Sequence, residues 1–391
     1  MGPSNEHAPL HGITVLDVGR VVAGPVTAFY LAALGADVIR VDGPGGDVSW
    51  RVPPFIGPDA SRSQERRDDD VSVGHLRRAR GKRSVVLDIT TDEGRDAFLA
   101  LADSADVVIE NLRPGAMSKH GCGVEEVRSR NARLVWCSIS GYGQTGPYAH
   151  RAAIDICVQA ESGLLYRTGW PDAPPVRAGA TVADHFGAYN AVIAVLSALR
   201  QRDHTGVGCH LDVSMLDAVA MMLWDEALDI DPVGYSERQG NGDRRGTPHG
   251  VYPTTNGSVA IVVTSDDLWM QLGKLTNAKD FTDAYPTLRD RIAARDTIDA
   301  WLSEWTSKRT SSDVADFLGN VGIPVGVVRT GYDTLEHPQL RHREFFESLR
   351  APVSGVDSGL YGTRLPFLID GRGLSAGPAE PLGWSTGDVT S

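Results

Sequence analysis

Two short apolar runs near the start of the chain, joined by a segment with helix signals, constrain its fold most strongly. Residues 13–18 (ITVLDV) and 36–42 (ADVIRVD) are rich in β-branched residues, which favour buried strands. Between them, Pro25 suits the first turn of a helix and Gly35 suits a helix end. This order predicts a βαβ unit and a parallel sheet covered by helices. The turn after the first strand has no GxGxxG motif, so no dinucleotide site is predicted there.

The same alternation of strands and helices continues through the first half of the chain. The predicted strands are residues 85–89, 105–110, 133–140 and 210–213, and the predicted helices are residues 91–102, 154–165 and 215–230. At 391 residues the chain is too long for one ordinary core, so we expect two domains. After about residue 231 the composition changes, and the patterns that follow indicate a smaller α+β region.

We therefore divide the chain into four consecutive parts. Residues 1–225 form the first part of a large α/β domain, and residues 226–250 form a linker or lid. Residues 251–325 form a small α+β domain, and residues 326–391 return to complete the large domain.

Charge and cysteine content exclude several classes of function. The net charge of −12 argues against a surface for nucleic acid or for an anionic membrane. The four cysteines lie far apart without a CxxC pair, which predicts reduced thiols and no zinc site. No signal peptide or membrane-spanning run is recognised in the sequence. We expect a cytoplasmic protein that binds neither nucleic acid nor membrane and holds no metal.

A single carboxylate, Asp184, stands at the start of the helix predicted within residues 175–201. Small residues precede it, and the helix that follows is apolar on most sides, which predicts a buried helix. An aspartate at a helix start is ordinarily an N-cap that accepts hydrogen bonds from free backbone N–H groups. Residue type and position alone therefore favour a structural role for Asp184.

Two further segments place basic or polar residues beside predicted strands. Residues 77–84 (RRARGKRS) lead into one strand, and residues 111–119 (NLRPGAMSK) follow the end of another. In open α/β sheets, ligands bind beyond the carboxyl ends of the strands. A run of charged residues is more often a solvated surface than a binding site. Both interpretations stay open on these residues alone.

Seven segments in order carry a resemblance to a known family. They are residues 10–25 (LHGITVLDVGRVVAGP), 34–42 (LGADVIRVD), 81–88 (GKRSVVLD), 110–121 (ENLRPGAMSKHG), 140–148 (SGYGQTGPY), the segment around Asp184, and residues 205–218 (TGVGCHLDVSMLDA). Together they resemble the class III CoA-transferases, which include formyl-CoA transferase and carnitine CoA-transferase. A sister branch contains α-methylacyl-CoA racemase. Each segment is loose alone, and the order and spacing of all seven carry the resemblance.

The resemblance implies a fold and an assembly. The family has a Rossmann-like large domain built from both ends of the chain, together with a smaller domain. Two subunits thread through each other as interlocked rings, so the resemblance implies an obligate homodimer. Its stability would then be inseparable from its assembly.

The resemblance also places Asp184 on the family's catalytic aspartate. In the transferases this carboxylate attacks the acyl-CoA thioester and forms a mixed anhydride. The released CoA thiolate then gives an aspartyl-CoA thioester, and an acceptor carboxylate takes up the CoA through a second anhydride. A carboxylate held tightly as a helix cap is a poor nucleophile, so we expect Asp184 to be capped loosely or not at all.

The resemblance also implies which residues bind coenzyme A. Val21, Val22 and Ala23 match the loop beside the pantetheine arm, and Arg20 stands where formyl-CoA transferase has histidine. The candidates for the adenine and ribose-phosphate end are Arg40, Lys82 and Arg83. The candidates for the loop that packs on CoA are Asn111 and Lys119. Guanidinium and ammonium groups suit phosphate oxygens by charge and by donor count. Arg20, Arg238 and Arg244 are candidates to meet a second carboxylate on a dicarboxylic substrate.

Departures from the family pattern weigh on the alternatives. The racemase branch uses a Gly-His-Asp motif whose histidine is a base, and Ile154 stands at that position here. Because opposite-face proton transfer needs two acid–base groups, the isoleucine favours the transferase. Ser140 replaces a lysine of the formyl enzyme, and residues 238–246 (RQGNGDRRG) are only a distant match for its Gly-rich lid. The alternatives are an acyl-CoA racemase or epimerase and a CoA-binding protein without turnover.

Overall fold

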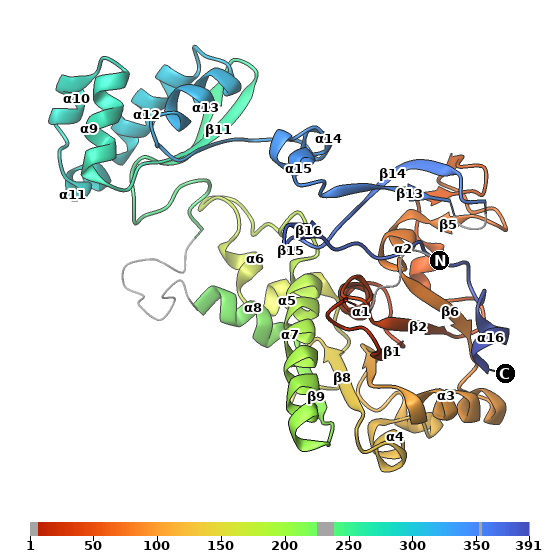
Figure 1. The fold of residues 1–391 in the computed structure, drawn as a ribbon. Helices are drawn as coiled ribbons and strands as arrows, with labels where there is room; N and C mark the ends of the chain where they lie inside the picture. The colour runs from red at the N-terminus through yellow and green to blue at the C-terminus, as the bar shows by residue number, and fades with distance from the viewer. Residues whose placement is uncertain (1–6, 225–237, 352–353, 391) are drawn as a thin grey trace. The chain divides into compact units, whose positions relative to one another are not determined.

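The computed structural model describes residues 7–224, 238–351 and 354–390. Its contacts divide the chain into two compact units (Figure 1). The first unit holds residues 1–162, 179–223 and 337–391, and the second holds residues 163–178 and 224–336. Residues 226–237 of the predicted linker or lid lie outside the described residues.

A six-stranded parallel sheet forms the centre of the first unit. Its strands are β1 (Thr14–Asp17), β2 (Asp37–Asp42), β6 (Lys82–Val86), β7 (Val107–Glu110), β8 (Val135–Ser140) and β9 (His210–Ser214). They lie in the order β6-β2-β1-β7-β8-β9, and every neighbouring pair is parallel. Numbered along the chain, this is the 3-2-1-4-5-6 order of a doubly wound sheet. The predicted parallel α/β architecture is confirmed.

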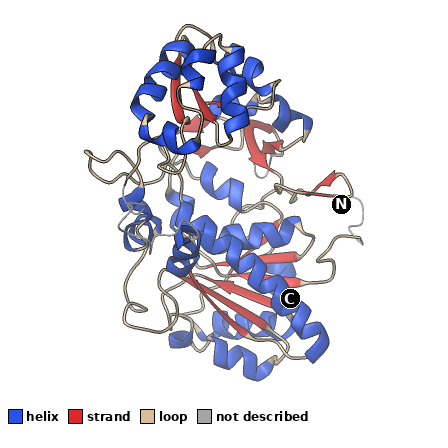
Figure 2. Cartoon of the chain, turned by 90° about the vertical axis from the view of Figure 1, so that its left-hand side faces the viewer, coloured by secondary structure: helices blue, strands red, loops and turns tan. Residues whose placement is uncertain are grey.

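Helices cover both faces of this sheet (Figure 2). The principal ones are α1 (Ala23–Ala33), α3 (Asp92–Ser104), α4 (Val124–Arg130), α5 (Asp155–Glu161), α7 (Val182–Thr205) and α8 (Met215–Trp224). Phe98 of α3 and Val127 of α4 join Trp136 of the sheet in one buried cluster. Helix α7 packs on the opposite face of β8, where Ile139 lies close to Gly187. Helix α1 contacts both α7 and β1.

Helix α7 is buried on one face only, in contrast to the all-round burial predicted from its apolar sequence. Ala183, Ala188 and Val195 are buried, whereas Ile193 is 63% exposed. By length and composition alone α7 could cross a membrane, and 44% of its most apolar window is buried inside the protein. The buried part packs on the sheet and on α1.

The long loop between β2 and β6 contains more structure than its polar sequence indicates. It includes the 3-10 helix η1 (Val48–Arg51), a small sheet of β3 (Phe55–Ile56), β4 (Arg62–Ser63) and β5 (Val71–Ser72), and helix α2 (Val73–Arg78). Trp50, Ile56 and Leu76 are buried together in this segment. The loop is therefore a packed layer that carries α2.

The end of the chain packs back onto this layer. It holds α15 (Pro338–His342), β13 (Phe346–Arg350), β14 (Asp357–Thr363), β15 (Leu368–Ile369), β16 (Arg372–Gly373) and α16 (Thr386–Thr390). Arg80 pairs with Glu347 and donates to the Thr363 carbonyl oxygen at 2.7 Å. The Ser84 N–H of β6 donates to Glu380 at 2.8 Å. Both chain ends thus build the first unit.

The second unit has a core of its own. Its antiparallel sheet consists of β10 (His249–Thr254), β11 (Gly257–Val262) and β12 (Val325–Val327). Its helices are α6 (Leu164–Arg167), α9 (Asp266–Leu275), α10 (Lys279–Asp283), α11 (Leu288–Ala293), α12 (Arg295–Thr306), α13 (Ser311–Gly319) and α14 (Gly331–Leu335). Trp269, Ile261 and Leu302 are fully buried in its centre.

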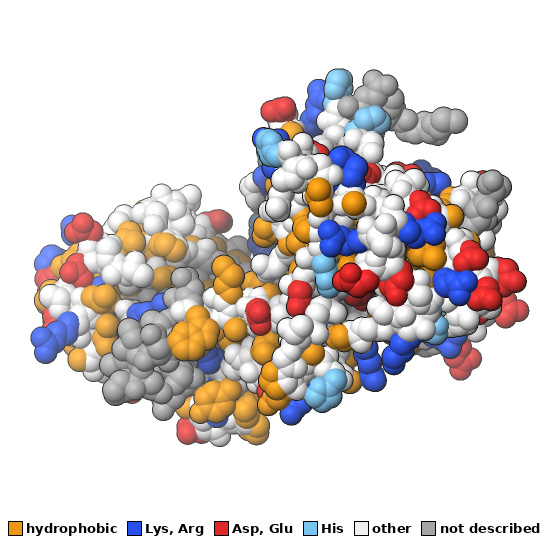
Figure 3. Space-filling view, turned by 90° about the horizontal axis from the view of Figure 1, so that it is seen from below, with side chains coloured by type: hydrophobic (Ala, Val, Ile, Leu, Met, Phe, Trp, Pro, Cys, Tyr) orange, Lys and Arg blue, Asp and Glu red, His pale blue; other side chains and the backbone are white. Residues whose placement is uncertain are grey.

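The surface carries both signs of charge. On the face drawn in Figure 3, acidic and basic side chains are interspersed rather than gathered by sign. The net charge of −12 is therefore not concentrated in one acidic patch on this face.

Candidate active site

The strand order of the sheet reverses between β1 and β7, and this is where open α/β sheets bind ligands. The chain leaves β1 through Gly19 and turns into α1 at Gly24. A Cβ atom at Gly19 would lie 2.7 Å from the Gly24 Cα, so neither position has room for a side chain. The two glycines therefore let residues 20–23 cross the carboxyl end of the sheet in a tight turn.

Asn111, which follows β7, holds this turn from the other side of the reversal. Its Oδ1 accepts a hydrogen bond from the Arg20 N–H at 2.5 Å, and its Nδ2 donates to the Arg20 carbonyl oxygen at 2.9 Å. One side chain thus satisfies both backbone groups of one residue. The turn between β1 and α1 is fixed to the end of β7 by this pair of bonds.

Val21 adopts a backbone conformation that a β-branched residue rarely takes. Its φ is 59°, in the left-handed region, and its side chain is 42% exposed. Its N–H donates to Asp47 Oδ2 at 2.9 Å, and this bond stabilises the strained geometry. Backbone strain of this kind concentrates at functional sites.

A buried ion network lies beneath the turn. Arg40 donates to Asp42 at 2.8 Å, to Asp47 at 2.9 Å and to Asp17 at 3.4 Å. Lys82 Nζ donates to Asp17 at 2.8 Å and to the Pro25 carbonyl oxygen at 2.8 Å. Burial alone would raise the pKa of Asp17, but the two cations outweigh it and hold that pKa below its ordinary value. The network anchors β1, β2, β6 and the start of α1 to one another.

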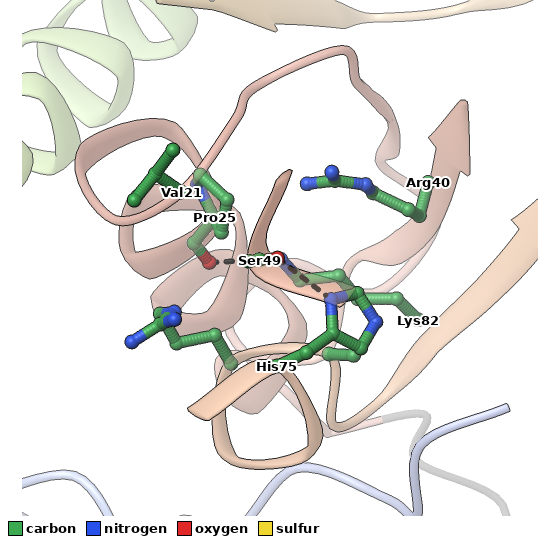
Figure 4. A pocket seen from close by; sticks show the side chains of 8 residues that line it. Val21, Pro25, Arg40, Ser49, His75 and Lys82 are labelled. Atoms are coloured by element: carbon green, nitrogen blue, oxygen red, sulfur yellow. Dashed lines mark hydrogen bonds between the residues drawn. The ribbon is translucent and has the colours of Figure 1, made fainter. Parts of the chain in front are cut away.

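A small hollow of mixed polar and apolar lining lies beside the network (Figure 4). It is lined by Val21, Pro25, Arg40, Ser49, His75, Arg78, Ala79 and Lys82. His75 stacks on Trp50 with the ring centroids 3.8 Å apart, and its Nδ1 lies 3.1 Å from the Ser49 hydroxyl oxygen. Burial and the nearby Arg40 lower the pKa of His75 to about 3, so its ring is neutral at pH 7.

Asp184 lies in the first turn of α7, on the side that faces the turn after β1. Val22 of that turn is buried against Ala188 of α7. Asp184 precedes Ala188 by four residues, and residues with this spacing lie on the same face of a helix. The carboxylate therefore lies one helical turn from the contact between α7 and the Val21–Val22 segment.

Asp155, and not Asp184, caps the start of α7. Its Oδ1 accepts hydrogen bonds from the Ala183 N–H at 2.8 Å and from the Asp184 N–H at 3.4 Å. The N-cap residue itself, Thr181, makes no side-chain capping bond. Within the described part of the chain, no hydrogen bond reaches the Asp184 carboxylate. The capping role that residue type favours for Asp184 is thus performed by a residue from helix α5.

The electrostatic surroundings make the Asp184 carboxylate more basic than usual. Burial, together with the negative charge of Asp155, raises the pKa of Asp184 to about 6, and Arg78 opposes this effect. At pH 7 the group is mainly ionised. An ionised, half-buried carboxylate without hydrogen bonds is suited to act as a nucleophile.

Comparison with known proteins identifies the family. The model of CoA-transferase family III matches residues 10–383. A succinyl-CoA:mesaconate CoA-transferase from Haloarcula marismortui is 33% identical, over 95% of this chain and 93% of its own. A succinate–glutarate CoA-transferase from Agrobacterium fabrum is 32% identical, over 93% of this chain and 90% of its own. The chain belongs to CoA-transferase family III.

The fold is shared with solved members of this family. The crystal structure of a CaiB/BaiF family protein from Brucella suis superposes with a TM-score of 0.85 and 31% sequence identity. The match covers 98% of this chain and 98% of that one. The CoA-transferase fold thus extends over both compact units.

Some of the site residues predicted from the sequence lie together in the structure, and others lie apart. Arg20, Val21, Val22, Ala23 and Asn111 lie together at the reversal point, and α7 with Asp184 packs beside them. These five residues and Asp184 share one end of the sheet. Their roles in binding coenzyme A and in catalysis stay predictions.

The predicted basic residues lie in three different surroundings. Arg40 and Lys82 are each only 3% exposed, and their donors engage the carboxylates of the ion network. Arg83 pairs with Asp37 at 2.5 Å near the amino ends of β2 and β6. Lys119 is exposed in the 3-10 helix η2 (Ser118–His120). A phosphate that binds Arg40 or Lys82 would have to compete with buried carboxylates for their donors.

Two residues near Asp184 were not found by sequence reasoning. Arg78 belongs to the basic run at residues 77–84, but the resemblance pointed only to Lys82 and Arg83. Asp155 adjoins Ile154 in the sequence, and its hydrogen bonds to α7 join residues 28 and 29 positions apart, which no local pattern indicates. Among the described residues no group of three or more His, Cys, Asp or Glu side chains has an arrangement that could hold a metal ion.

Proposed function

We propose that this chain is an acyl-CoA:carboxylate CoA-transferase in which Asp184 is the nucleophile. The observation that carries the proposal is the Asp184 carboxylate itself, which has no hydrogen-bond donor among the described residues and stands beside the turn that follows β1. Its cap function is taken over by Asp155, so its oxygens are free to attack. The family membership supports CoA transfer as the reaction.

The proposed reaction passes through three intermediates on Asp184. The carboxylate oxygen attacks the carbonyl carbon of the acyl-CoA thioester, the C–S bond breaks, and a mixed anhydride and CoA thiolate result. The thiolate attacks the aspartyl carbonyl, which releases the first carboxylic acid and leaves an aspartyl-CoA thioester. An acceptor carboxylate then attacks the carbonyl carbon of this thioester, its C–S bond breaks, and the second anhydride and CoA thiolate result. Return of the thiolate to the acceptor's carbonyl yields the new acyl-CoA and regenerates Asp184.

The turn at residues 20–23 is suited to hold the thioester end of the substrate. It is fixed by Asn111, and its strained residue Val21 faces the hollow that Arg78 also lines. A fixed turn positions the reacting carbonyl against Asp184 without an ordering cost at each turnover. The names of both relatives reported above specify dicarboxylic acids, which supports a carboxylate as the acceptor.

At the position that holds the base in the racemase branch, this chain has no acid–base group. Position 154 holds an isoleucine that is 66% exposed. Asp155 is close by, but its Oδ1 accepts bonds from α7 and its Oδ2 accepts a bond from Gln159 Nε2 at 2.6 Å. A carboxylate with both oxygens engaged is a poor proton shuttle.

We also propose a homodimer and a cytoplasmic location. Exposed apolar side chains on α7 and α8, among them Tyr189, Ile193 and Met221, support an interface between two copies. The interlocked arrangement is the form that the family resemblance implies. The four cysteines are free thiols, which supports a reducing compartment.

Isotope exchange tests the proposed reaction. The full chain is incubated with an acyl-CoA and the labelled free acid of the same acyl group, and label entering the thioester is measured by mass spectrometry. The proposal predicts exchange by the wild type and a loss of at least roughly 1,000-fold in Asp184→Asn, since the amide is not a nucleophile. Label that enters the thioester equally fast in both proteins would contradict it.

A further inference from the structure

Arg78 is a cation of the site to which the reaction proposed above assigns no role. It is the last residue of α2 and lines the same hollow as Val21 and Pro25. Its Nε is buried and has no hydrogen-bond partner among the described residues. The other two cations of the hollow, Arg40 and Lys82, are each engaged by buried carboxylates. Arg78 therefore retains a donor that faces no protein acceptor.

The fold places Arg78 next to the reacting carboxylate. The hollow that it lines is bounded by Val21, and the neighbouring Val22 shares a buried cluster with Ala188, one turn along α7 from Asp184. The charge of Arg78 also lowers the pKa of Asp184, and so opposes the increase that burial causes. Contacts and electrostatics therefore both place the guanidinium within reach of whatever reacts at Asp184.

Gly74 supports the orientation of this guanidinium. Arg78 Nη2 lies 3.2 Å from the place that a Cβ atom at Gly74 would occupy, one helical turn earlier on α2. The absence of a side chain at position 74 thus leaves space in which the guanidinium lies against the helix. Gly74→Ala would displace the group by a few tenths of an ångström while it keeps the charge.

We propose that Arg78 forms a subsite for a second carboxylate, so that this chain transfers CoA between dicarboxylic acids. This inference rests on the CoA transfer proposed above and names its substrate class. A planar guanidinium with a free donor is the side chain best suited to bind a carboxylate. Asp155 and Asp184 already place two negative charges in this region, so a substrate with a further carboxylate needs a cation there to enter.

The arginines that the sequence suggests for this role are placed differently. Arg238 belongs to the second unit, where it donates to the carbonyl oxygens of Trp170 at 3.0 Å and Tyr166 at 3.1 Å. Arg244 belongs to the same unit. Arg20 is exposed, and its backbone is held by Asn111. Of these arginines and Arg78, only Arg78 combines the hollow with a charge that acts on Asp184.

A matched pair of thioesters tests the subsite. Succinyl-CoA and butyryl-CoA have acyl chains of the same length and differ in the terminal carboxylate. For wild type, Arg78→Met and Arg78→Lys, kcat/KM is measured by exchange with the labelled parent acid. We expect Arg78→Met to lower the ratio of kcat/KM for succinyl-CoA to kcat/KM for butyryl-CoA by roughly 10- to 100-fold, as loss of one charged hydrogen bond implies. Arg78→Lys should recover part of the loss.

Two further variants act as controls. Arg77 is the neighbouring arginine, exposed and bonded to the Tyr361 carbonyl oxygen, and Arg77→Met should leave both substrates unchanged. Gly74→Ala should lower kcat/KM for succinyl-CoA selectively but less than Arg78→Met does.

An equal loss of kcat/KM with both thioesters in Arg78→Met, or no loss with either, would overturn the subsite, while exchange by the wild type would still uphold the transferase. A wild type that uses butyryl-CoA in preference to succinyl-CoA would also overturn it, and one inactive with both would overturn the transferase and the subsite together.

Discussion

The chemistry that we propose for this chain depends on which residue accepts the hydrogen bonds of the N–H groups at the start of α7. An aspartate in the first turn of a helix ordinarily accepts those bonds itself. Here Asp155 accepts them from a different helix, and the Asp184 carboxylate receives none within the described residues. Burial and the Asp155 charge together raise the pKa of Asp184 to about 6. The nucleophilic role that we propose for Asp184 thus depends on the surroundings of the residue rather than on its position in the helix.

The pH dependence of transfer follows from this pKa. Because the proposed nucleophile is the ionised carboxylate, we expect kcat/KM to rise with pH through about 6 and then to level off. Asp155→Asn removes the like charge and keeps an acceptor for the α7 N–H groups. This variant should therefore move the acid limb to lower pH. A pH–rate profile of both proteins measures the shift, and an unmoved limb in Asp155→Asn would exclude the like-charge effect.

The same raised pKa predicts a stability cost at neutral pH. A carboxyl group whose folded pKa exceeds its ordinary value of 3.8 adds stability below that value, and the gain is lost as pH rises through about 6. Asp184→Asn should therefore be more stable than wild type at pH 8, by roughly 1–3 kcal/mol, and equally stable near pH 4. Denaturant unfolding at the two pH values checks this. A variant less stable than wild type at pH 8 would show that Asp184 supports the fold.

At the scale of elements, the strand–helix alternation could be predicted from the sequence because most strands of the central sheet contain a short run of β-branched or other apolar residues. The small sheet of β3, β4 and β5 could not be predicted, since its two-residue strands have no period to detect.

Among the site residues, Asp184 was recognisable as part of a family segment. Arg78 and Asp155 were not, because their importance comes from contacts between elements far apart in sequence. The burial of Arg40 and Lys82 was missed for the same reason: Asp17, Asp42 and Asp47 converge on them only after folding.

The two hydrogen bonds from Asn111, which follows β7, to the Arg20 backbone clamp the turn after β1, and this clamp gives a prediction at the scale of elements. Asn111→Ala removes both hydrogen bonds to Arg20, so residues 20–23 lose their fixed position over the sheet. We expect KM for the acyl-CoA to rise by roughly 5- to 50-fold, as two lost hydrogen bonds imply. Asn131→Ala is a matched control, because Asn131 Nδ2 donates to the Ala102 and Ala105 carbonyl oxygens away from the site. Equal KM values for the two variants would contradict the clamp.

At the scale of the whole molecule, the first unit depends on both ends of the chain and leaves an apolar face uncovered. Residues 337–390 pack onto the segment around α2 through Arg80 and Glu347, so the C-terminal return supports the layer that carries Arg78. On α7, Tyr189 and Ile193 are exposed, whereas the buried face of the helix packs on the sheet and α1. Apolar side chains exposed together are typical of an interface.

The proposed homodimer gives a prediction at this scale. Wild-type protein should have twice the mass of one chain at micromolar concentration. Ile193→Asp should shift the mass toward one chain, because it buries a charge in the interface. Light scattering after size-exclusion chromatography measures both masses. A monomeric wild type would contradict the homodimer, and a fully dimeric Ile193→Asp would place the interface elsewhere.

Covalent trapping tests the central claim, the nucleophilic carboxylate of Asp184, most directly. The protein is incubated with succinyl-CoA, quenched with hydroxylamine and digested, and the modified peptide is mapped by mass spectrometry. A hydroxamate at Asp184, absent from Asp184→Asn and retained in Asp155→Asn, is the predicted result. A hydroxamate at Asp155 or at any other carboxylate, or a wild type that exchanges label without forming a hydroxamate, would contradict the account.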